Sequence, residues 1–160
     1  MSLQYSCFSY DELSKGQLYE IMQLRQEVFV VEQNCPYLDA DGKDKIAYHL
    51  LGQDKAGTIL AYTRLLPKGS SYKDYCSIGR VLTAMQIRKQ GEGISLMNES
   101  IALCGKLYPN QDVKISAQSY LNEFYQNLGF VSTGEEYLED NIPHQAMIYK
   151  NKKDYPSEKE

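Results

Sequence analysis

The 160-residue sequence has no tryptophan, only two histidines and only four cysteines. The cysteines (Cys7, Cys35, Cys76 and Cys104) are far apart and form no Cys-x-x-Cys pair. Zinc sites and disulfide frameworks need clustered ligands or regularly spaced cysteine pairs. We therefore expect neither a metal nor a disulfide framework in this protein.

Long apolar runs and an excess of positive charge are absent as well. No run approaches the ~20 residues that span a bilayer, and residues 1–5 lack the charged start and apolar region of a secretory signal. We therefore expect a cytoplasmic protein that does not bind membranes. The formal net charge of -4 argues against nucleic-acid binding, which depends mainly on excess Lys and Arg, and suits a cationic partner.

The length fits one domain that buries roughly 70% of its unfolded surface. We expect this domain over residues 1–150, followed by a charged, frayed tail over residues 151–160. The hydrophobic patterns predict the order strand, helix, three strands, helix, strand, helix and two strands. The predicted strands lie near residues 3–9, 46–52, 58–66, 76–83 and 113–117, from 130 and around 145–150. The predicted helices run over 14–33, from 94 and over 120–128.

A basic turn that contains glycine stands between the strand-like run at 76–83 and a helical pattern. It consists of Arg88, Lys89, Gln90, Gly91, Glu92, Gly93 and Ile94. Free N–H groups and the helix dipole favour phosphate at a helix start, and glycines let the backbone approach it. A dinucleotide-binding turn would need a third glycine where Leu96 stands, and the Gly-Lys-Ser/Thr of a nucleotide P-loop is absent. The turn therefore predicts a site for a different phosphate ligand.

The remaining pattern, Arg/Gln-x-x-Gly-x-Gly, resembles the pyrophosphate-binding turn of the GNAT superfamily of acyl-CoA N-acyltransferases. Downstream, Phe124-Tyr125 and Gly129-Phe130 have the spacing of the Phe-Tyr-x-x-x-Gly-Phe segment of that superfamily. Residues 24–37, Ile78-Gly79-Arg80-Val81 and Ile142-Pro143-His144 are similar to its ElaA-like family. The resemblance extends from near the N-terminus to the last strand and covers essentially one domain.

The resemblance implies an α/β (α+β) fold of the GNAT type. Its sheet is mixed and twisted, with six to seven strands, helices on both faces and a V-shaped splay between strands four and five. The resemblance also implies acetyl-CoA as co-substrate, with the thioester in the splay and the pyrophosphate on the turn at Arg88 to Ile94. Val81, Leu82 and Thr83 would pair with the pantetheine arm, and Gln118 and Phe124 are assigned to the same site. Gln118 stands where the superfamily often has asparagine, and Leu121 where it often has alanine.

Tyr125 lies on an apolar helical stripe, where a core aromatic is the simpler interpretation. In GNAT enzymes the matching tyrosine often protonates the departing CoA thiolate, so the resemblance implies a catalytic role. Cys35 falls in a predicted loop, and we interpret it as incidental because no histidine is close in sequence to activate it.

The acceptor side is predicted from charged and titratable residues in unusual places. Arg25 interrupts an apolar helix face, so its charge must be paired or must face a ligand. Glu32 and Arg80 leave the same two interpretations open, an ion pair or a substrate contact. Either histidine could accept a proton from an ammonium group, although a lone strand histidine is more often structural. With the resemblance, we assign His49 as catalytic and Arg25, Glu32, Arg80 and His144 to substrate, with loops 36–45 and 135–144 building the pocket.

Together these features predict an N-acetyltransferase that moves an acetyl group from acetyl-CoA to an amine on a small molecule or peptide. The amine would attack directly in a ternary complex. Two alternatives stay open. One is an acyl-CoA enzyme with another acceptor, because residues 25–33 resemble acyl-homoserine-lactone synthases. The other is a non-catalytic acyl-CoA-binding regulatory module. A homodimer is compatible with each of them.

Overall fold

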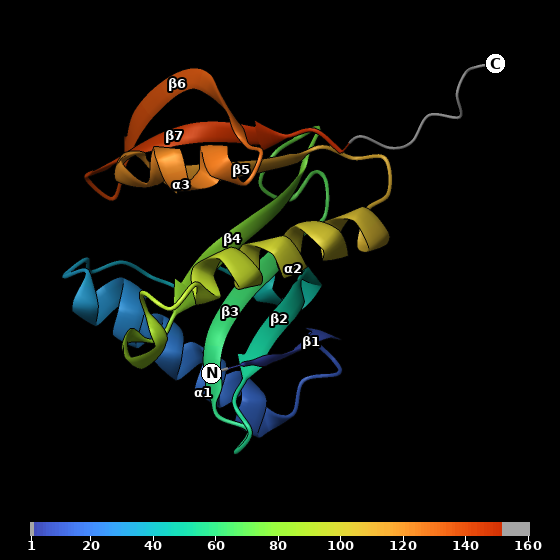
Figure 1. Ribbon diagram of the computed structural model, residues 1–160, viewed down its shortest axis with the longest axis vertical. Helices are drawn as coiled ribbons and strands as arrows, with labels where there is room; N and C mark the ends of the chain where they lie inside the picture. Colours follow the sequence, from blue (N-terminus) through green and yellow to red (C-terminus); the bar gives the residue numbers. More distant parts are fainter. Residues whose placement is uncertain (1, 152–160) are drawn as a thin grey trace.

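The computed structural model describes residues 2–151. One mixed sheet has the strand order β1-β2-β3-β4-β5-β7-β6 and is flanked by helices on both faces (Figure 1). The strands are β1 (Gln4–Ser9), β2 (Tyr48–Gln53), β3 (Ile59–Leu66), β4 (Cys76–Thr83), β5 (Val113–Gln118), β6 (Val131–Glu139) and β7 (Ile142–Tyr149). The α-helices are α1 (Lys15–Arg25), α2 (Glu92–Leu107) and α3 (Asn122–Asn127). The predicted order of elements and the predicted fold class are confirmed.

The sheet opens between β4 and β5. These two strands are parallel, and only Cys76 with Val113 and Ser77 with Lys114 are paired. Beyond these pairs the strands diverge, so that β5, β7 and β6 form a separate wing at the top of Figure 1. All the other neighbouring strands are antiparallel. The predicted V-shaped splay is therefore present, and it leaves the second half of β4 without a partner on its β5 side.

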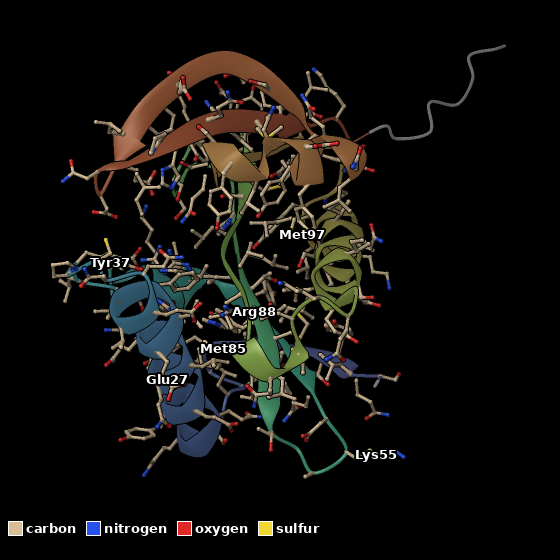
Figure 2. All side chains as sticks on the ribbon, turned by 60° about the vertical axis from the view of Figure 1, so that its left-hand side comes forward. Glu27, Tyr37, Lys55, Met85, Arg88 and Met97 are labelled. Atoms are coloured by element: carbon tan, nitrogen blue, oxygen red, sulfur yellow. The ribbon has the colours of Figure 1, made fainter. Side chains whose placement is uncertain are left out.

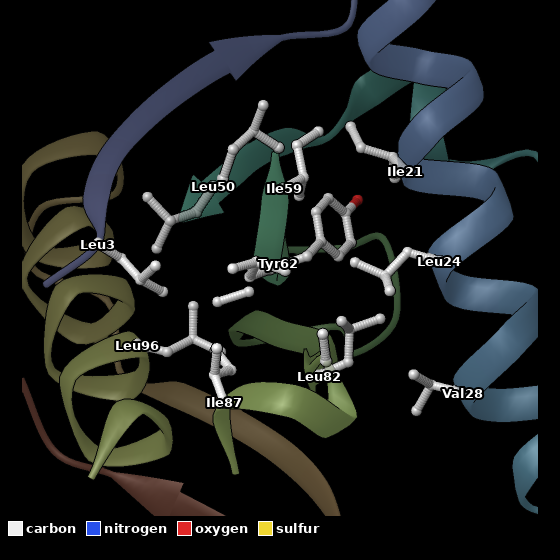
Figure 3. Close-up of a cluster of buried hydrophobic side chains, with 14 residues drawn as sticks. Leu3, Ile21, Leu24, Val28, Leu50, Ile59, Tyr62, Leu82, Ile87 and Leu96 are labelled. Atoms are coloured by element: carbon white, nitrogen blue, oxygen red, sulfur yellow. The ribbon is translucent and has the colours of Figure 1, made fainter. Parts of the chain in front are cut away.

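The central strand β3 is buried along its whole length because helices cover both of its faces. Successive side chains of a strand point to opposite faces. Tyr62 packs with Ile21 and Leu24 on the α1 face, whereas Thr63 hydrogen-bonds Ser100 of α2 at 2.8 Å on the other face. Figure 3 shows Ile21, Leu24 and Tyr62 together, with α2 on the opposite side of the strand.

The first helical region has the predicted extent but changes its winding. Ser14 caps α1 and Gln17 completes a capping box, because each side chain accepts a hydrogen bond from the backbone N–H of the other. After Arg25 the chain continues as the π-helix η1 (Gln26–Glu32). Short π-helical segments are rare and occur frequently at functional sites. The sequence did not predict this change.

Two segments predicted as loops are ordered differently. Residues 135–144 belong to the β6–β7 hairpin, so the prediction of a long loop there was wrong. Asp140 and Asn141, both with positive φ (51° and 64°), form its tight turn, and Asp and Asn tolerate this conformation. Loop 36–45 leads into the short 3₁₀ helix η2 (Lys43–Ile46). The predicted tail over residues 151–160 lies, apart from Asn151, outside the described residues.

None of the helices within residues 2–151 is both long enough and apolar enough to span a membrane.

Candidate active site

A cavity of about 430 Å³ occupies the gap between β4 and β5. Its walls come from η1 and the loop after it, β4, β5, α3 and the β6–β7 hairpin. In Figure 2, α1 and η1 lie on one side of β4, α2 lies on the other, and the wing of β5, β6 and β7 spans both. The cavity therefore opens through the sheet. The predicted site residues that line it are Glu32, Arg80, Val81, Leu82, Thr83, Arg88, Gln118, Tyr125 and His144.

A β-bulge interrupts β4 where it borders the cavity. Tyr62 pairs with Leu82 but Arg64 pairs with Gly79, so Arg80 and Val81 together lie opposite the single residue Thr63. Arg80 has a φ of 49°, a left-handed conformation that is strained for a residue with a side chain. A bulge leaves its extra residue out of the backbone ladder. On its other edge β4 has no β5 partner beyond Ser77, so its backbone there is free to bond a ligand where the sheet opens.

Buried ion pairs hold this bulge in place. Arg25 is fully buried, and its Nε donates to Asp39 at 2.8 Å while its Nη1 donates to Asp44 at 2.6 Å. Asp39 also accepts a hydrogen bond from Nε of Arg80 at 2.7 Å. Burial opposes the charge on Arg25, but the hydrogen bonds and negative charges of its partners raise the pKa of Arg25. Arg25 does not line the cavity, and these contacts match the ion-pair interpretation of it.

A second arginine extends the network toward β3. Arg64 donates to both carboxylate oxygens of Asp41 at 2.8 and 2.9 Å, and to Asp44 at 3.1 Å. Burial would raise the pKa of Asp41 and Asp44, but the hydrogen bonds and charges of the arginines outweigh it and lower both values. The charged network consists of Arg25, Asp39, Asp41, Asp44, Arg64 and Arg80. It joins the end of α1, the loop after η1, η2, β3 and β4.

His49 belongs to this buried region and does not line the cavity. Its Nε2 lies 2.9 Å from the carbonyl oxygen of Asp44, which only accepts hydrogen bonds, so Nε2 carries the proton. Its Nδ1 lies 2.6 Å from the hydroxyl of Tyr62 and therefore accepts from it. Burial lowers the pKa of His49. Because both of its ring nitrogens are hydrogen-bonded, a neutral His49 of β2 links Tyr62 of β3 to Asp44 of η2.

The predicted phosphate turn adjoins the cavity at Arg88. Gly91 precedes the first residue of α2 with a φ of 83°, and Lys89 has a φ of 64°, so the turn wraps around the helix N-terminus. Arg88 forms a two-pronged ion pair with Glu32, and its Nη2 donates at 2.9 Å. This pair links the turn to η1 across the mouth of the cavity.

The other residues of the turn lie beyond the cavity wall. Residues 89–94 do not line the cavity. The side chain of Glu92 is turned toward Tyr5, whose hydroxyl donates to it at 3.5 Å. A Cβ placed on Gly93 would lie 3.6 Å from the ring of Phe124, so Phe124 supports the turn from behind. Glu92 and Gly93 are therefore in contact with other parts of the protein at this turn.

Tyr125 enters the cavity from α3, on the α2 face of the sheet. Its ring packs edge-on against Phe124 and Phe130, with centroids 5.1 and 5.8 Å apart. Burial raises the pKa of Tyr125 to about 12, so the hydroxyl keeps its proton at neutral pH. Within residues 2–151 that hydroxyl has no protein partner, yet it is not among the buried unsatisfied polar atoms. It therefore opens onto the cavity as a hydrogen-bond donor.

Several lining residues were not predicted. Cys35 and Tyr37 come from the loop after η1, and Ser116, Glu139 and Asp140 come from β5 and the hairpin. Cys35 was considered only as an incidental thiol, and the hairpin residues were hidden within a predicted loop. The alternation of Ser116 and Gln118 along β5 would have placed both on one face.

Comparison with known proteins agrees with this architecture. Residues 39–151 match the family model described as "Acetyltransferase (GNAT) domain". Protein ElaA of Escherichia coli is 40% identical over 147 residues, which cover 91% of this chain and 95% of that protein. A UPF0039 protein of Synechocystis is 41% identical over 150 residues, or 94% and 97% of the two chains. The chain belongs to the GNAT superfamily of acyl-CoA N-acyltransferases and, within it, to the ElaA-like family.

Solved structures show the same relationship. An acyl-CoA N-acyltransferase from Pseudomonas aeruginosa superposes with a TM-score of 0.87 at 40% identity, covering 92% of this chain and 99% of that one. The crystal structure of Escherichia coli ElaA gives 0.86 at 38% identity with the same coverage. A CoA-dependent acyl-homoserine lactone synthase gives 0.77 at 18% identity, over 92% of this chain and 83% of that one. This last likeness shows a shared fold alone.

The buried network predicts a large stability difference between two arginines. Arg25→Met leaves Asp39 and Asp44 with one buried partner fewer, and breaking a buried pair costs about 3–5 kcal/mol. Arg88→Met removes the much more exposed pair with Glu32, whose side chain is 33% exposed, and such pairs contribute about 0–1 kcal/mol. Urea unfolding should show a larger loss in the free energy of unfolding for Arg25→Met than for Arg88→Met. Equal losses in the free energy of unfolding of the two variants would contradict a structural role for Arg25.

The same network makes stability depend on pH. Asp41 and Asp44 have lowered pKa values, so their contribution is complete above ~pH 4 and is lost as the pH falls through their folded-state values. The pKa of His49 is also lowered, so below ~pH 6.5 the unfolded chain binds its proton more readily than the folded one. The free energy of unfolding should therefore fall from pH 7.5 to pH 5, and fall further at pH 3.5.

Urea melts at these three pH values provide the test. His49→Gln supplies a matched variant, because the glutamine amide can still donate to the Asp44 carbonyl but does not titrate. Between pH 7.5 and pH 5 the free energy of unfolding of this variant should fall less than that of the unmodified protein. A free energy of unfolding that does not change between pH 7.5 and pH 5 would refute the assignment of a neutral, buried His49.

Proposed function

We propose that this protein transfers an acetyl group from acetyl-CoA to a primary amine by direct attack in a ternary complex. The observation that carries the proposal is a single cavity in the splay of the sheet, lined by Arg88 of the phosphate turn and, on the α2 face, by Tyr125. The chemistry needs two reactants in line and a donor for the departing sulfur. Family membership supports an acyl-CoA co-substrate.

The groups that would hold acetyl-CoA are mostly backbone groups. The N–H groups of Lys89 to Ile94, at the start of α2, suit a pyrophosphate. The unpaired edge of β4 at Val81, Leu82 and Thr83 suits the pantetheine amides, which would add to it like a strand, and Gln118 offers an amide from β5. Tyr125 would donate its O–H to the developing thiolate. A neutral phenol supplies that donor throughout the neutral pH range.

The amine would approach from the α1 face, between η1, β4 and the hairpin. Glu139 and Asp140 line that end of the cavity without an arginine partner, which favours a cationic acceptor. The donor placement of Tyr125 argues against a module that only binds. Incubation with acetyl-CoA and ethanolamine, putrescine, lysine or a lysine-containing peptide, with free CoA thiol as readout, tests the proposal.

The phosphate turn predicts that acetyl-CoA raises the melting temperature. At a hundredfold excess over Kd the gain is about 2.7 kcal/mol, or roughly 5–10 °C for a domain of this size. Gly91→Val should abolish the shift, because a side chain there would project into the space of the phosphate. Differential scanning fluorimetry measures both effects, and a wild-type protein without a shift would refute the cofactor assignment.

A matched control separates ligand loss from strain. Gly57 has a φ of 88° in the β2–β3 turn, with open space around it, as Gly91 has at 83°. Gly57→Val should therefore lower the melting temperature of the free protein to a similar extent and keep the acetyl-CoA shift. Acetyl-CoA should also slow the alkylation of Cys35, which lines the cavity, but not that of Cys7 on β1.

The donor role of Tyr125 predicts a kinetic effect without a binding effect. Tyr125→Phe removes only the hydroxyl, so kcat should fall by about 10²–10⁴ while the acetyl-CoA melting shift is kept. Steady-state assays at saturating acetyl-CoA test this, together with a pre-steady-state burst experiment to show that chemistry is rate-limiting. A Phe variant with wild-type kcat under that condition would reduce Tyr125 to a packing residue.

A further inference from the structure

We infer that His144 is the general base that deprotonates the acceptor ammonium group, an inference that rests on the proposed function. The protein has two histidines, and the structure fixes a different tautomer for each. His49 has both ring nitrogens bonded and lies outside the cavity. His144 lines the cavity and has one nitrogen left to act.

The tautomer of His144 follows from a single hydrogen bond. Its Nδ1 lies 2.7 Å from the carbonyl oxygen of Ile142. A carbonyl only accepts, so Nδ1 carries the proton and the lone pair of the neutral ring is on Nε2. The residue is 7% exposed, and no group within residues 2–151 bonds Nε2. Nor is Nε2 one of the buried polar atoms without a partner. The lone pair therefore opens onto the cavity.

The register places His144 and Tyr125 on opposite faces of the sheet. His144 pairs with Gln118 of β5, and directly paired antiparallel residues point to the same face. Ile115 and Ala117, which belong to the core cluster of Tyr125, alternate with Gln118 and point to the other face. The base thus enters the cavity from the α1 face and the thiolate donor from the α2 face. Direct attack requires this separation of the two groups.

The hairpin also places an aromatic ring and a carboxylate beside His144. Tyr137 stacks on His144 with a centroid distance of 6.3 Å, and its hydroxyl donates to Ser116, which donates to Glu139 at 2.8 Å. Tyr137 is paired with His144 and Glu139 with Ile142, so Glu139 is a diagonal neighbour of the histidine on the same face. A carboxylate there attracts an ammonium acceptor to the side of the cavity where His144 lies.

The proton transfers of this mechanism balance. The ammonium group gives one proton to Nε2, and the freed nitrogen lone pair attacks the acetyl carbonyl carbon. The C–N bond forms, the C–S bond breaks, and the electron pair leaves on sulfur. Tyr125 gives its proton to sulfur and recovers the second proton of the attacking nitrogen. The imidazolium then releases its proton to water, so one proton is released per acetyl group transferred.

Two variants separate a base from a structural residue. In His144→Asn the amide nitrogen takes the place of Nδ1 and can still donate to the Ile142 carbonyl, but no lone pair remains at the Nε2 position. In His144→Gln the amide reaches toward the Nε2 position instead. A base predicts that both variants lose about 10²–10⁴-fold in kcat at pH 7 and keep the acetyl-CoA melting shift. A structural role predicts that the Asn variant stays active.

The pH profile gives a second readout. The ring of Tyr137 of β6 stacks on His144. The other charged and titratable groups that line the cavity with His144 are Glu32, Cys35, Tyr37, Arg80, Arg88, Tyr120, Tyr125, Glu139 and Asp140. Without a base, only acceptor already deprotonated in solution reacts. With putrescine or ethanolamine as acceptor, the rates of both variants should therefore rise about tenfold per pH unit up to the pKa of the amine. The wild-type rate should reach its plateau at lower pH.

The possible results have distinct meanings. Wild-type kcat in the Asn variant, or variant profiles parallel to that of the wild type, would overturn the assignment of His144. Loss of the acetyl-CoA melting shift in both variants would overturn it too, because it would place His144 in cofactor binding. A wild-type protein that acetylates none of the four amines would instead refute the proposed function itself.

Discussion

The site depends on one buried guanidinium. Arg25 ends α1, and its hydrogen bonds to Asp39 and Asp44 fasten the loop after η1 to the sheet. Asp39 in turn holds Arg80, which has the positive φ of the β4 bulge. A strained strand residue persists only where its surroundings over-determine it. The bulge lies in the part of β4 that lines the cavity, so Arg25 supports the site without lining it.

The limited pairing of β4 and β5 explains why the cavity passes through the sheet. Two residue pairs close one end of these strands, and antiparallel partners complete their outer edges. The two strands therefore diverge without leaving their other edges unpaired, which limits the cost of exposed backbone groups. Reactants can meet in the gap from two faces. This geometry suits a reaction in which one reactant is held by backbone groups and the other by side chains.

Much of the fold could be predicted from the sequence because its signals are local. The Ser14 capping box, the turn ending at Gly57 and the strand–turn–helix pattern around Gly91 each depend on a few neighbouring residues. The bulge at Arg80 could not be predicted, because its ion pair joins residues far apart in the sequence. No local pattern marks the π-helix after Arg25 either. Both strands of the β6–β7 hairpin were predicted, but residues 135–144 were predicted as a loop because several of them are acidic. In the structure these residues extend the two strands, and β7 also pairs with β5.

The site residues also divide into those that local motifs identify and those that they do not. The glycine turn and Tyr125 were identified through motifs, which record backbone geometry. From the sequence, His49 was assigned as catalytic and His144 to the substrate side, whereas the hydrogen bonds favour the opposite choice. His49 lies between Tyr62 and the Asp44 carbonyl, and His144 is bonded to Ile142 by one nitrogen only. Spacing along the chain specifies which face a side chain occupies. Spacing does not specify whether a residue distant in the sequence already hydrogen-bonds the lone pair of that side chain.

The ion pair between Arg88 and Glu32 connects the two sides of the cavity. Arg88 belongs to the phosphate turn and Glu32 to η1, which borders the side proposed for the acceptor. The pair lowers the pKa of Glu32 and raises that of Arg88, so both are charged at neutral pH. An anion that approaches the turn must compete with Glu32 for this guanidinium, and a carboxylate released from it adds negative charge to the amine side. Binding at one end of the cavity thereby changes the electrostatic potential at the other.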